Sequence, residues 1–151
     1  MTQTKIFLAT DHAGFALKEF LKEHLQRAGH SIEDCGAYAY EKADDYPDFI
    51  KKAALGVQKD PETKAILLGY SGQGEAMIAN RYKGVRAAVY YGGTQDIILL
   101  SREHNNANVL SLGAGFLSND EALSAVSQWL DTPFTNEERH ARRIRKIDES
   151  H

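Results

Sequence analysis

Short apolar runs alternate with helical patterns along the whole chain, and this alternation limits the possible folds more than any other feature. The runs KIFLA, AILL and VLSL are rich in Ile, Leu and Val, as buried strands are. Between them lie segments with apolar residues at helical spacing, such as Leu17, Phe20, Leu21 and Leu25. Strictly alternating strands and helices favour a parallel sheet covered by helices on both faces. We therefore predict an α/β fold.

Five strands and six helices are expected along the chain. The strands are predicted at residues 5–9, 30–35, 65–68, 85–91 and 109–112. The helices are predicted at residues 14–28, 47–58, 75–81, 94–104, 119–130 and 136–148. Ligands of such sheets bind at the carboxyl ends of the strands. That rim is expected to comprise residues 10–14, 36–46, 69–75, 91–95 and 113–117.

Length and composition narrow the class of protein. The 151 residues are enough for one domain, which we take as residues 1–151. A net charge of −3 gives no basic field for nucleic acid, and no apolar run reaches the ~20 residues that a membrane helix needs. The single cysteine, Cys35, cannot form an internal disulfide, which fits a reducing compartment. We expect a soluble cytoplasmic protein with neither nucleic-acid nor membrane partners.

A glycine-rich loop, LLGYSGQGEA at residues 67–76, follows the third predicted strand. Gly69 and Gly74 have the spacing of a nucleotide phosphate loop, but Glu75-Ala76 replaces its lysine and hydroxyl residue. The dinucleotide fingerprint fails as well, because Met77 stands where its last glycine belongs. The loop is therefore not expected to bind a nucleotide.

The same loop fits proton transfer at carbon. Its glycines let backbone N–H groups converge on an anion, and Glu75 beside them can remove a proton next to a carbonyl. The helix N-terminus is expected to keep Glu75 ionised near neutral pH. Alternatively, Glu75 is only a first-turn acid that complements the helix dipole, and the loop alone favours this interpretation.

Two further polar groups lie next to predicted strands. Asp11 and His12 follow the first strand, and His104 and Asn105 precede the fifth. We expect Asp11, His12 and His104 on the same rim, where they can move protons on sugar hydroxyls. A histidine taken alone is more often a packing or surface residue. The histidines lack paired metal-ligand spacing, so the expected chemistry needs no metal.

The C-terminal segment RHARRIRK, residues 139–146, contains basic residues and no acid. Arg139, Arg142, Arg143 and Lys146 share one face of the predicted helix. Such a charged face is usually solvated, yet arginine also binds phosphate oxygens bidentately. A helix at the end of a compact domain often packs on a neighbouring subunit, so these arginines can serve a partner's site.

Motifs spread over nearly the whole chain resemble one family, the type B ribose-5-phosphate isomerases and their galactose-6-phosphate isomerase relatives. They are DHAGFALK after the first strand, DDYPDF at 44–49, GYSGQGEAMIANR at 69–81, GVRAA, SREHNNANVLSLG and RHARR. The resemblance implies a three-layer α/β/α sandwich of Rossmann-like type that dimerises, or forms a dimer of dimers. Residues 136–151 are then the C-terminal helix at the dimer interface.

The resemblance also implies an activity, the metal-independent isomerisation of aldose and ketose phosphates through a cis-enediolate, as in pentose phosphate metabolism. No cofactor is expected. One branch of the family uses a cysteine at the start of the glycine loop as base, where this chain has Gly69. The chain is similar to the other branch, in which the loop glutamate, here Glu75, is the base.

The remaining site residues follow from the same motifs. Ser71 and the amides of Gly72 to Gly74 are expected to hold the enediolate oxygen, and Asp11 and His104 to assist ring opening. The expected sugar-phosphate contacts are Tyr46 and Asn105 around the sugar, Tyr70 at its side, and His12 with a partner's Arg139 and Arg143 at the phosphate.

The chain departs from the family's pattern at three places. Tyr70 replaces a usual glycine and is expected to narrow the sugar site, and Gly115 replaces a usual arginine after the fifth strand. The loop YYGGTQD is also slightly longer. These departures leave open another pentose or hexose phosphate as substrate. A non-catalytic sugar-phosphate-binding subunit is the rival interpretation. A receiver-type signalling domain fits poorly, because Asp44-Asp45 does not follow the first strand.

Overall fold

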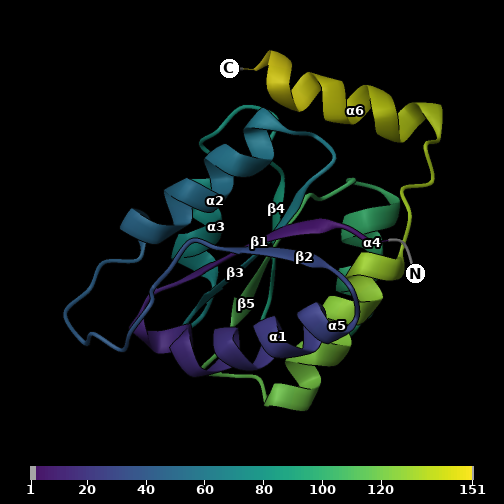
Figure 1. The fold of residues 1–151 in the computed structure, drawn as a ribbon. Coiled ribbons are helices and arrows are strands. Elements are labelled where there is room, and N and C mark those ends of the chain that lie inside the picture. Colours follow the sequence, from purple (N-terminus) through teal and green to yellow (C-terminus); the bar gives the residue numbers. More distant parts are fainter. Residues whose placement is uncertain (1–2, 151) are drawn as a thin grey trace.

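The computed structural model describes residues 3–150, which fold around a five-stranded parallel sheet in the order β2-β1-β3-β5-β4 (Figure 1). The strands are β1 (Lys5–Thr10), β2 (Ser31–Asp34), β3 (Lys64–Gly69), β4 (Ala87–Tyr90) and β5 (Val109–Gly113). The helices are α1 (Phe15–Arg27), α2 (Pro47–Lys59), α3 (Gln73–Ala79), α4 (Asp96–Glu103), α5 (Asn119–Asp131) and α6 (Glu138–Glu149). The predicted α/β fold with five parallel strands is confirmed.

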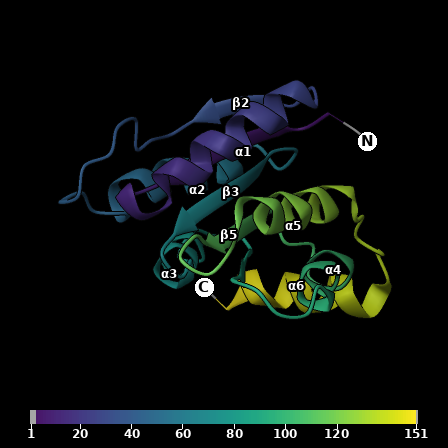
Figure 2. The same ribbon diagram turned by 90° about the horizontal axis from the view of Figure 1, so that it is seen from below.

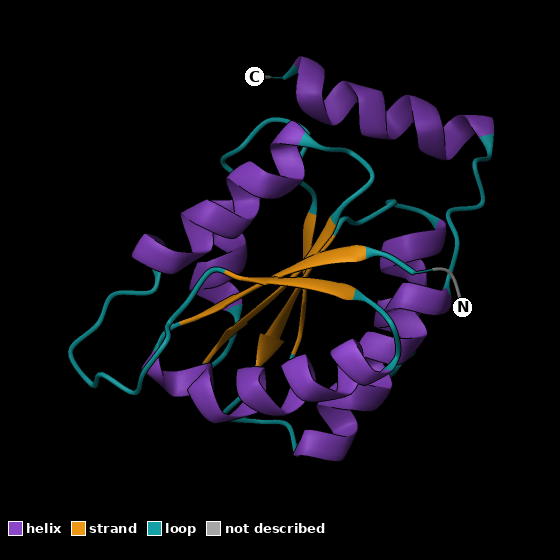
Figure 3. Cartoon of the chain, in the orientation of Figure 1, coloured by secondary structure: helices purple, strands orange, loops and turns teal. Residues whose placement is uncertain are grey.

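Helices cover both faces of the sheet, as Figure 3 shows with strands between two helical layers. Successive side chains of a strand point to opposite faces, so β3 divides its residues between two cores. Ile66 and Leu68 pack in the core that contains α1, α4 and α5, whereas Ala65 and Leu67 face α2 and α3. All four are fully buried, which explains why β3 reads as one apolar run.

Local sequence signals account for several element boundaries. Pro47 opens α2, where its missing N–H costs nothing. Ser118 and Glu121 form a reciprocal capping box at the start of α5. Helix α3 begins at Gln73 rather than at the predicted Glu75, because Gly72 adopts a left-handed conformation with φ 80° and ends the loop earlier.

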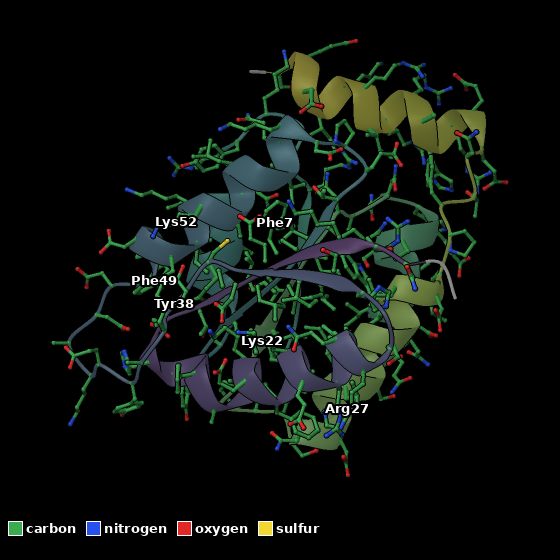
Figure 4. All side chains as sticks on the ribbon, viewed as in Figure 1. Phe7, Lys22, Arg27, Tyr38, Phe49 and Lys52 are labelled. Carbon is green, nitrogen blue, oxygen red and sulfur yellow. The ribbon has the colours of Figure 1, made fainter. Side chains whose placement is uncertain are left out.

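Close contact between α2 and the sheet depends on a glycine. A Cβ on Gly56 would lie 2.5 Å from the ring of Phe7, which extends from β1 toward α2 (Figure 4). A short 3-10 helix, His12–Gly14, which the sequence did not predict, joins β1 to α1. Asp11 caps it by accepting a hydrogen bond from Ala13 N–H at 2.9 Å. Asp11 is thereby fixed at the carboxyl end of β1.

Helix α6 lies outside the two helical layers, on the β4 side of the molecule and away from β2 (Figure 2). An extended segment leads to it, and Thr135 there donates through N–H and Oγ1 to Glu103 O at 3.2 and 2.9 Å. Near its end, Asp148 accepts a hydrogen bond from Gly84 N–H at 3.0 Å. No helix within residues 3–150 is both long and apolar enough to cross a membrane.

Candidate active site

A cavity of about 310 Å³ lies at the carboxyl ends of β1 and β3, beside the first turn of α3. Its lining comprises Asp11, His12, Ala13, Tyr46, Tyr70, Ser71, Gly74 and Glu75. Seven of the site residues that the sequence predicted therefore lie together in one chain. The topology explains the grouping, because parallel strands all end at the same edge of the sheet.

Glu75 lies at the bottom of this cavity and is 5% exposed. Its carboxyl group occupies the space above Gly69, where a Cβ on residue 69 would overlap it. Glycine at position 69 is therefore required for this placement of the carboxyl. Glu75 does lie in the first turn of α3, as the alternative interpretation expects, but its carboxyl is buried in the cavity and does not face water.

Burial raises the pKa of Glu75 above its ordinary value, and the nearby Asp11 carboxylate adds to the rise. The backbone N–H of Glu75 acts in the opposite direction but more weakly than burial. Desolvation thus outweighs the effect of the Glu75 backbone N–H on this pKa. A carboxylate with a raised pKa is a stronger proton acceptor.

The conformation of the glycine loop is fixed by contacts with β5, with Tyr46 and within the loop itself. Gly72 O accepts a hydrogen bond from Ser111 Oγ at 2.6 Å, and Ser71 Oγ accepts one from Gln73 N–H at 3.3 Å. The Tyr46 hydroxyl packs over Gly74, where a Cβ would lie 2.5 Å away. The first N–H groups of a helix have no intrahelical acceptors, and in α3 the N–H of Gln73 is already bonded to Ser71 Oγ.

His12 is held by an aspartate that the sequence analysis did not assign to the site. Asp44 Oδ1 accepts from His12 N–H at 3.1 Å and lies 2.7 Å from His12 Nδ1. This hydrogen bond raises the pKa of His12 and favours the imidazolium. The motif DDYPDF carried the signal for Asp44, but its partner lies 32 residues away in sequence.

One group of possible metal ligands occurs within residues 3–150. Ligand atoms of Asp11, His12 and Asp44 lie within 4.8 Å of one another. The His12–Asp44 hydrogen bond already engages one ring nitrogen and one carboxylate oxygen. The close approach of these three side chains is therefore explained by the His12–Asp44 ion pair, which orients His12 at the cavity.

The expectation that His104 and Asn105 share a rim with Asp11 is wrong for a single chain. Both residues follow α4 and precede β5, so they lie at the amino end of the sheet. The ring of His104 stacks on that of His140 from α6, with centroids 4.2 Å apart and planes 17° apart. Asn105 lines a separate groove of about 430 Å³ between β4, α4 and α6.

The basic residues of α6 are also distant from Glu75 in the same chain. Arg139 and Arg143 are exposed, and Arg139 makes one ion pair, with Glu137 at 3.4 Å. His140 is buried, and both burial and the neighbouring His104 lower its pKa. A single chain therefore places Asp11, Ser71 and Glu75 in one cavity and His104, Asn105 and the arginines elsewhere.

Known proteins share both this fold and these motifs. A structure of ribose-5-phosphate isomerase B from Thermotoga maritima matches with a TM-score of 0.90 at 42% identity, over 98% of this chain and 99% of that one. One from Mycoplasma genitalium with bound ribulose-5-phosphate matches with a TM-score of 0.93 at 36% identity, over 99% and 97%. Ribose-5-phosphate isomerase B of Mycolicibacterium paratuberculosis is 41% identical over 140 residues, which are 93% of this chain and 87% of that protein. The family model described as Ribose/Galactose Isomerase matches residues 6–147, and this chain belongs to that family.

Proposed function

We propose that this protein interconverts an aldose phosphate and a ketose phosphate, of the ribose 5-phosphate and ribulose 5-phosphate type, with Glu75 as the base. The observation that carries the proposal is the Glu75 carboxyl, buried above Gly69 in a cavity that also contains Asp11 and Ser71. Relatives named ribose-5-phosphate isomerase B support the choice of substrate. A protein that merely bound sugar phosphates would have no need to bury two acids together.

The reaction is a proton transfer between neighbouring carbons of the open-chain sugar. Glu75 removes the proton from C2, the C–H electrons form the C1–C2 double bond, and O1 becomes the oxyanion of a cis-enediolate. The protonated Glu75 then returns the proton to C1, while the proton of the O2 hydroxyl passes to O1, so that C1 carries a hydroxyl and C2 becomes the ketone. Ser71 and the amides of Gly72 to Gly74 stabilise the oxygen that carries the charge.

Binding and ring opening use groups around this centre. Asp11 exchanges a proton with the ring oxygen or the C1 hydroxyl, together with His104 of a second copy. Tyr46 and the second copy's Asn105 contact the sugar. The His12 imidazolium, held by Asp44, contributes positive charge for the phosphate with Arg139 and Arg143 of that copy.

A homodimer follows from the separation of the two halves of the machinery. Helix α6 (Glu138–Glu149) carries the arginines to the neighbouring site. Ile147 is 45% exposed on this helix, and Ile97 and Leu100 of α4 are 44% and 45% exposed. Apolar side chains exposed on neighbouring elements fit a surface covered by another copy.

Replacing the base tests the chemistry. Glu75→Gln retains size and burial, so we expect folding to be preserved and kcat to fall by about 10²–10⁴. Isomerisation of ribose 5-phosphate in deuterium oxide, followed by NMR, measures both turnover and deuterium incorporation at C1 of the ribulose 5-phosphate that forms. Incorporation at the wild-type rate in Glu75→Gln would show that another group is the base.

Mixing two inactive variants tests the shared site. Each proposed site combines Glu75 of one copy with His104 of the other. In a heterodimer of Glu75→Gln and His104→Ala, one site therefore lacks both residues and the other site is intact. After subunit exchange, activity should return to about a quarter of the wild-type value for a two-fold symmetric dimer. Absence of recovery in a mixture shown to contain heterodimers would place His104 outside the partner's site.

A further inference from the structure

One wall of the cavity is aromatic. Tyr70 lines the cavity with Asp11 and Glu75, and it is 64% exposed. Its ring meets that of Phe116 edge-on at 5.4 Å between centroids, and Phe116 in turn lies 5.9 Å from Tyr91. Three aromatic side chains that follow β3, β4 and β5 thus form one cluster, and Tyr70 is its member that lines the cavity.

The position of the Tyr70 ring depends on the absence of a side chain at residue 115. A Cβ on Gly115 would lie 2.5 Å from the Tyr70 ring. Backbone pairing fixes this relation, because Gly115 N–H donates to Tyr70 O at 2.9 Å and Ala114 N–H donates to Gly69 O at 2.8 Å. Tyr70 and Gly115 therefore act as a unit: the glycine provides the space and the ring fills it.

An aromatic wall beside Glu75 limits the size of the substrate. Tyr70 and Glu75 belong to the same loop and face the same cavity, whose volume of about 310 Å³ is at the small end of ligand pockets. The family's description covers both ribose and galactose, sugars that differ by one carbon with its hydroxyl. Such a difference must be accommodated at the walls of the cavity.

We propose that Tyr70, seated on Gly115 and supported by Phe116, makes this site selective for five-carbon over six-carbon sugar phosphates. This inference rests on the proposed function for the class of substrate. The aromatic ring offers its face to the C–H groups of the shorter chain and occupies the volume that an additional CHOH unit needs. Tyr70 is thus a specificity-determining residue and takes no part in the proton transfer.

Binding of non-reacting analogues tests the inference separately from catalysis. Ribitol 5-phosphate and galactitol 6-phosphate are open-chain and cannot isomerise, so calorimetric Kd values report the fit alone. We expect the wild-type protein to prefer the five-carbon analogue by about tenfold or more, as one additional carbon in a fitted pocket permits. Tyr70→Ala should reduce this ratio to about threefold or less by improving the binding of the longer analogue.

Two further variants separate the ring from its hydroxyl and from its position. Tyr70→Phe keeps the ring and should keep the wild-type ratio. Gly115→Ala should displace the ring, which is exposed and free to move, and give an intermediate ratio with an unchanged Tm. A wild-type ratio near one, or an unchanged ratio in folded Tyr70→Ala, would overturn the inference. Failure of the wild-type protein to isomerise any sugar phosphate would instead contradict the proposed function, and the binding ratios would still decide whether Tyr70 selects for chain length.

Discussion

The Glu75 cavity and helix α6 differ in how much of their surroundings one chain supplies. Around the cavity, Glu75 is 5% exposed and Asp11 is 8% exposed. Backbone hydrogen bonds from the residues that follow β5 to Gly69 and Tyr70 fix the start of the glycine loop. On α6, His140 is buried while the arginines lie on the surface. In the proposed function the cavity is one half of a site, and the exposed arginines of α6 serve the cavity of a second copy.

The Glu75 cavity and helix α6 also differ in the contacts that fix their structures. The cavity depends on glycines that leave room for particular groups, as Gly69 does for Glu75 and Gly74 for Tyr46. Helix α6 depends on its anchors, the bonds of Thr135 and Asp148 to the body of the chain. Substitutions in the cavity should therefore act through steric overlap, and substitutions on α6 through a second copy.

The largest expected effect comes from Gly69→Ala. The added Cβ would overlap the Glu75 carboxyl and push it out of its place above β3. We expect kcat to fall by about 10²–10⁴, as for loss of a general base, while circular dichroism shows an intact fold. Steady-state kinetics with ribose 5-phosphate measures the loss.

A double variant identifies the overlap as the cause. In a Glu75→Ala background the carboxyl is gone, so adding Gly69→Ala should leave Tm nearly unchanged. An equal loss of stability in both backgrounds would mean that the new Cβ meets something other than Glu75.

The next largest effect is expected from Lys18→Met, beneath the loop that carries Asp44 and Tyr46. Lys18 is fully buried, and its Nζ lies 2.7 and 2.8 Å from the Asp34 oxygens and 2.8 Å from Ala37 O. Removing one partner of a buried pair costs about 3–5 kcal/mol of unfolding free energy. Urea unfolding of the variant measures the loss.

Lys22 provides the matched control for this pair. It also contacts Asp34, at 3.1 Å, but its side chain is 33% exposed (Figure 4). Lys22→Ala should cost about 1 kcal/mol or less. Equal losses in the two variants would contradict the assignment of the buried pair as the brace of this loop.

The pH dependence of activity should reveal the burial of Glu75. The base must be ionised, and its pKa is raised, so kcat/KM should decline as pH falls through a value above the ordinary ~4.3 of glutamate. Ionising a buried carboxyl also opposes folding above that pKa, so Glu75→Gln should have a Tm at neutral pH equal to or above the wild type. An acid limb at or below pH ~4.3 would contradict the buried, desolvated base.

The strands, the helices and the acidic glycine loop were predictable because their signals are local. Periodicity predicted β3 and α1, and the sequence GYSGQGE placed a carboxylate next to glycines. His104 was misplaced because a residue that precedes a parallel strand lies at the opposite edge from one that follows it. In the proposed function His104 acts at the site of a second copy, and the strand and helix patterns of one chain do not describe that placement.

Two contacts were beyond sequence reasoning because they depend on tertiary placement. Asp44 meets His12 only when the loop after β2 folds back over the end of β1. The departures at Tyr70 and Gly115 were recognised separately, and their coupling appears only when the pairing of β3 with β5 brings the two residues together. Both contacts join segments far apart in the chain.

The smallest expected effect is that of Arg142→Ala. It serves as the control for Arg143→Ala, which we expect to change substrate binding. Arg142 pairs with Glu138 one turn earlier at 2.7 Å, and both side chains are largely exposed. Such a helix pair contributes about 0.3–0.5 kcal/mol, so the variant should change neither KM nor Tm appreciably. In the proposed function Arg143 donates to the substrate phosphate in the partner's site, so Arg143→Ala should raise KM for ribose 5-phosphate about tenfold. Kinetics of the two variants side by side measure the difference, and equal KM values would assign α6 a role in stability alone.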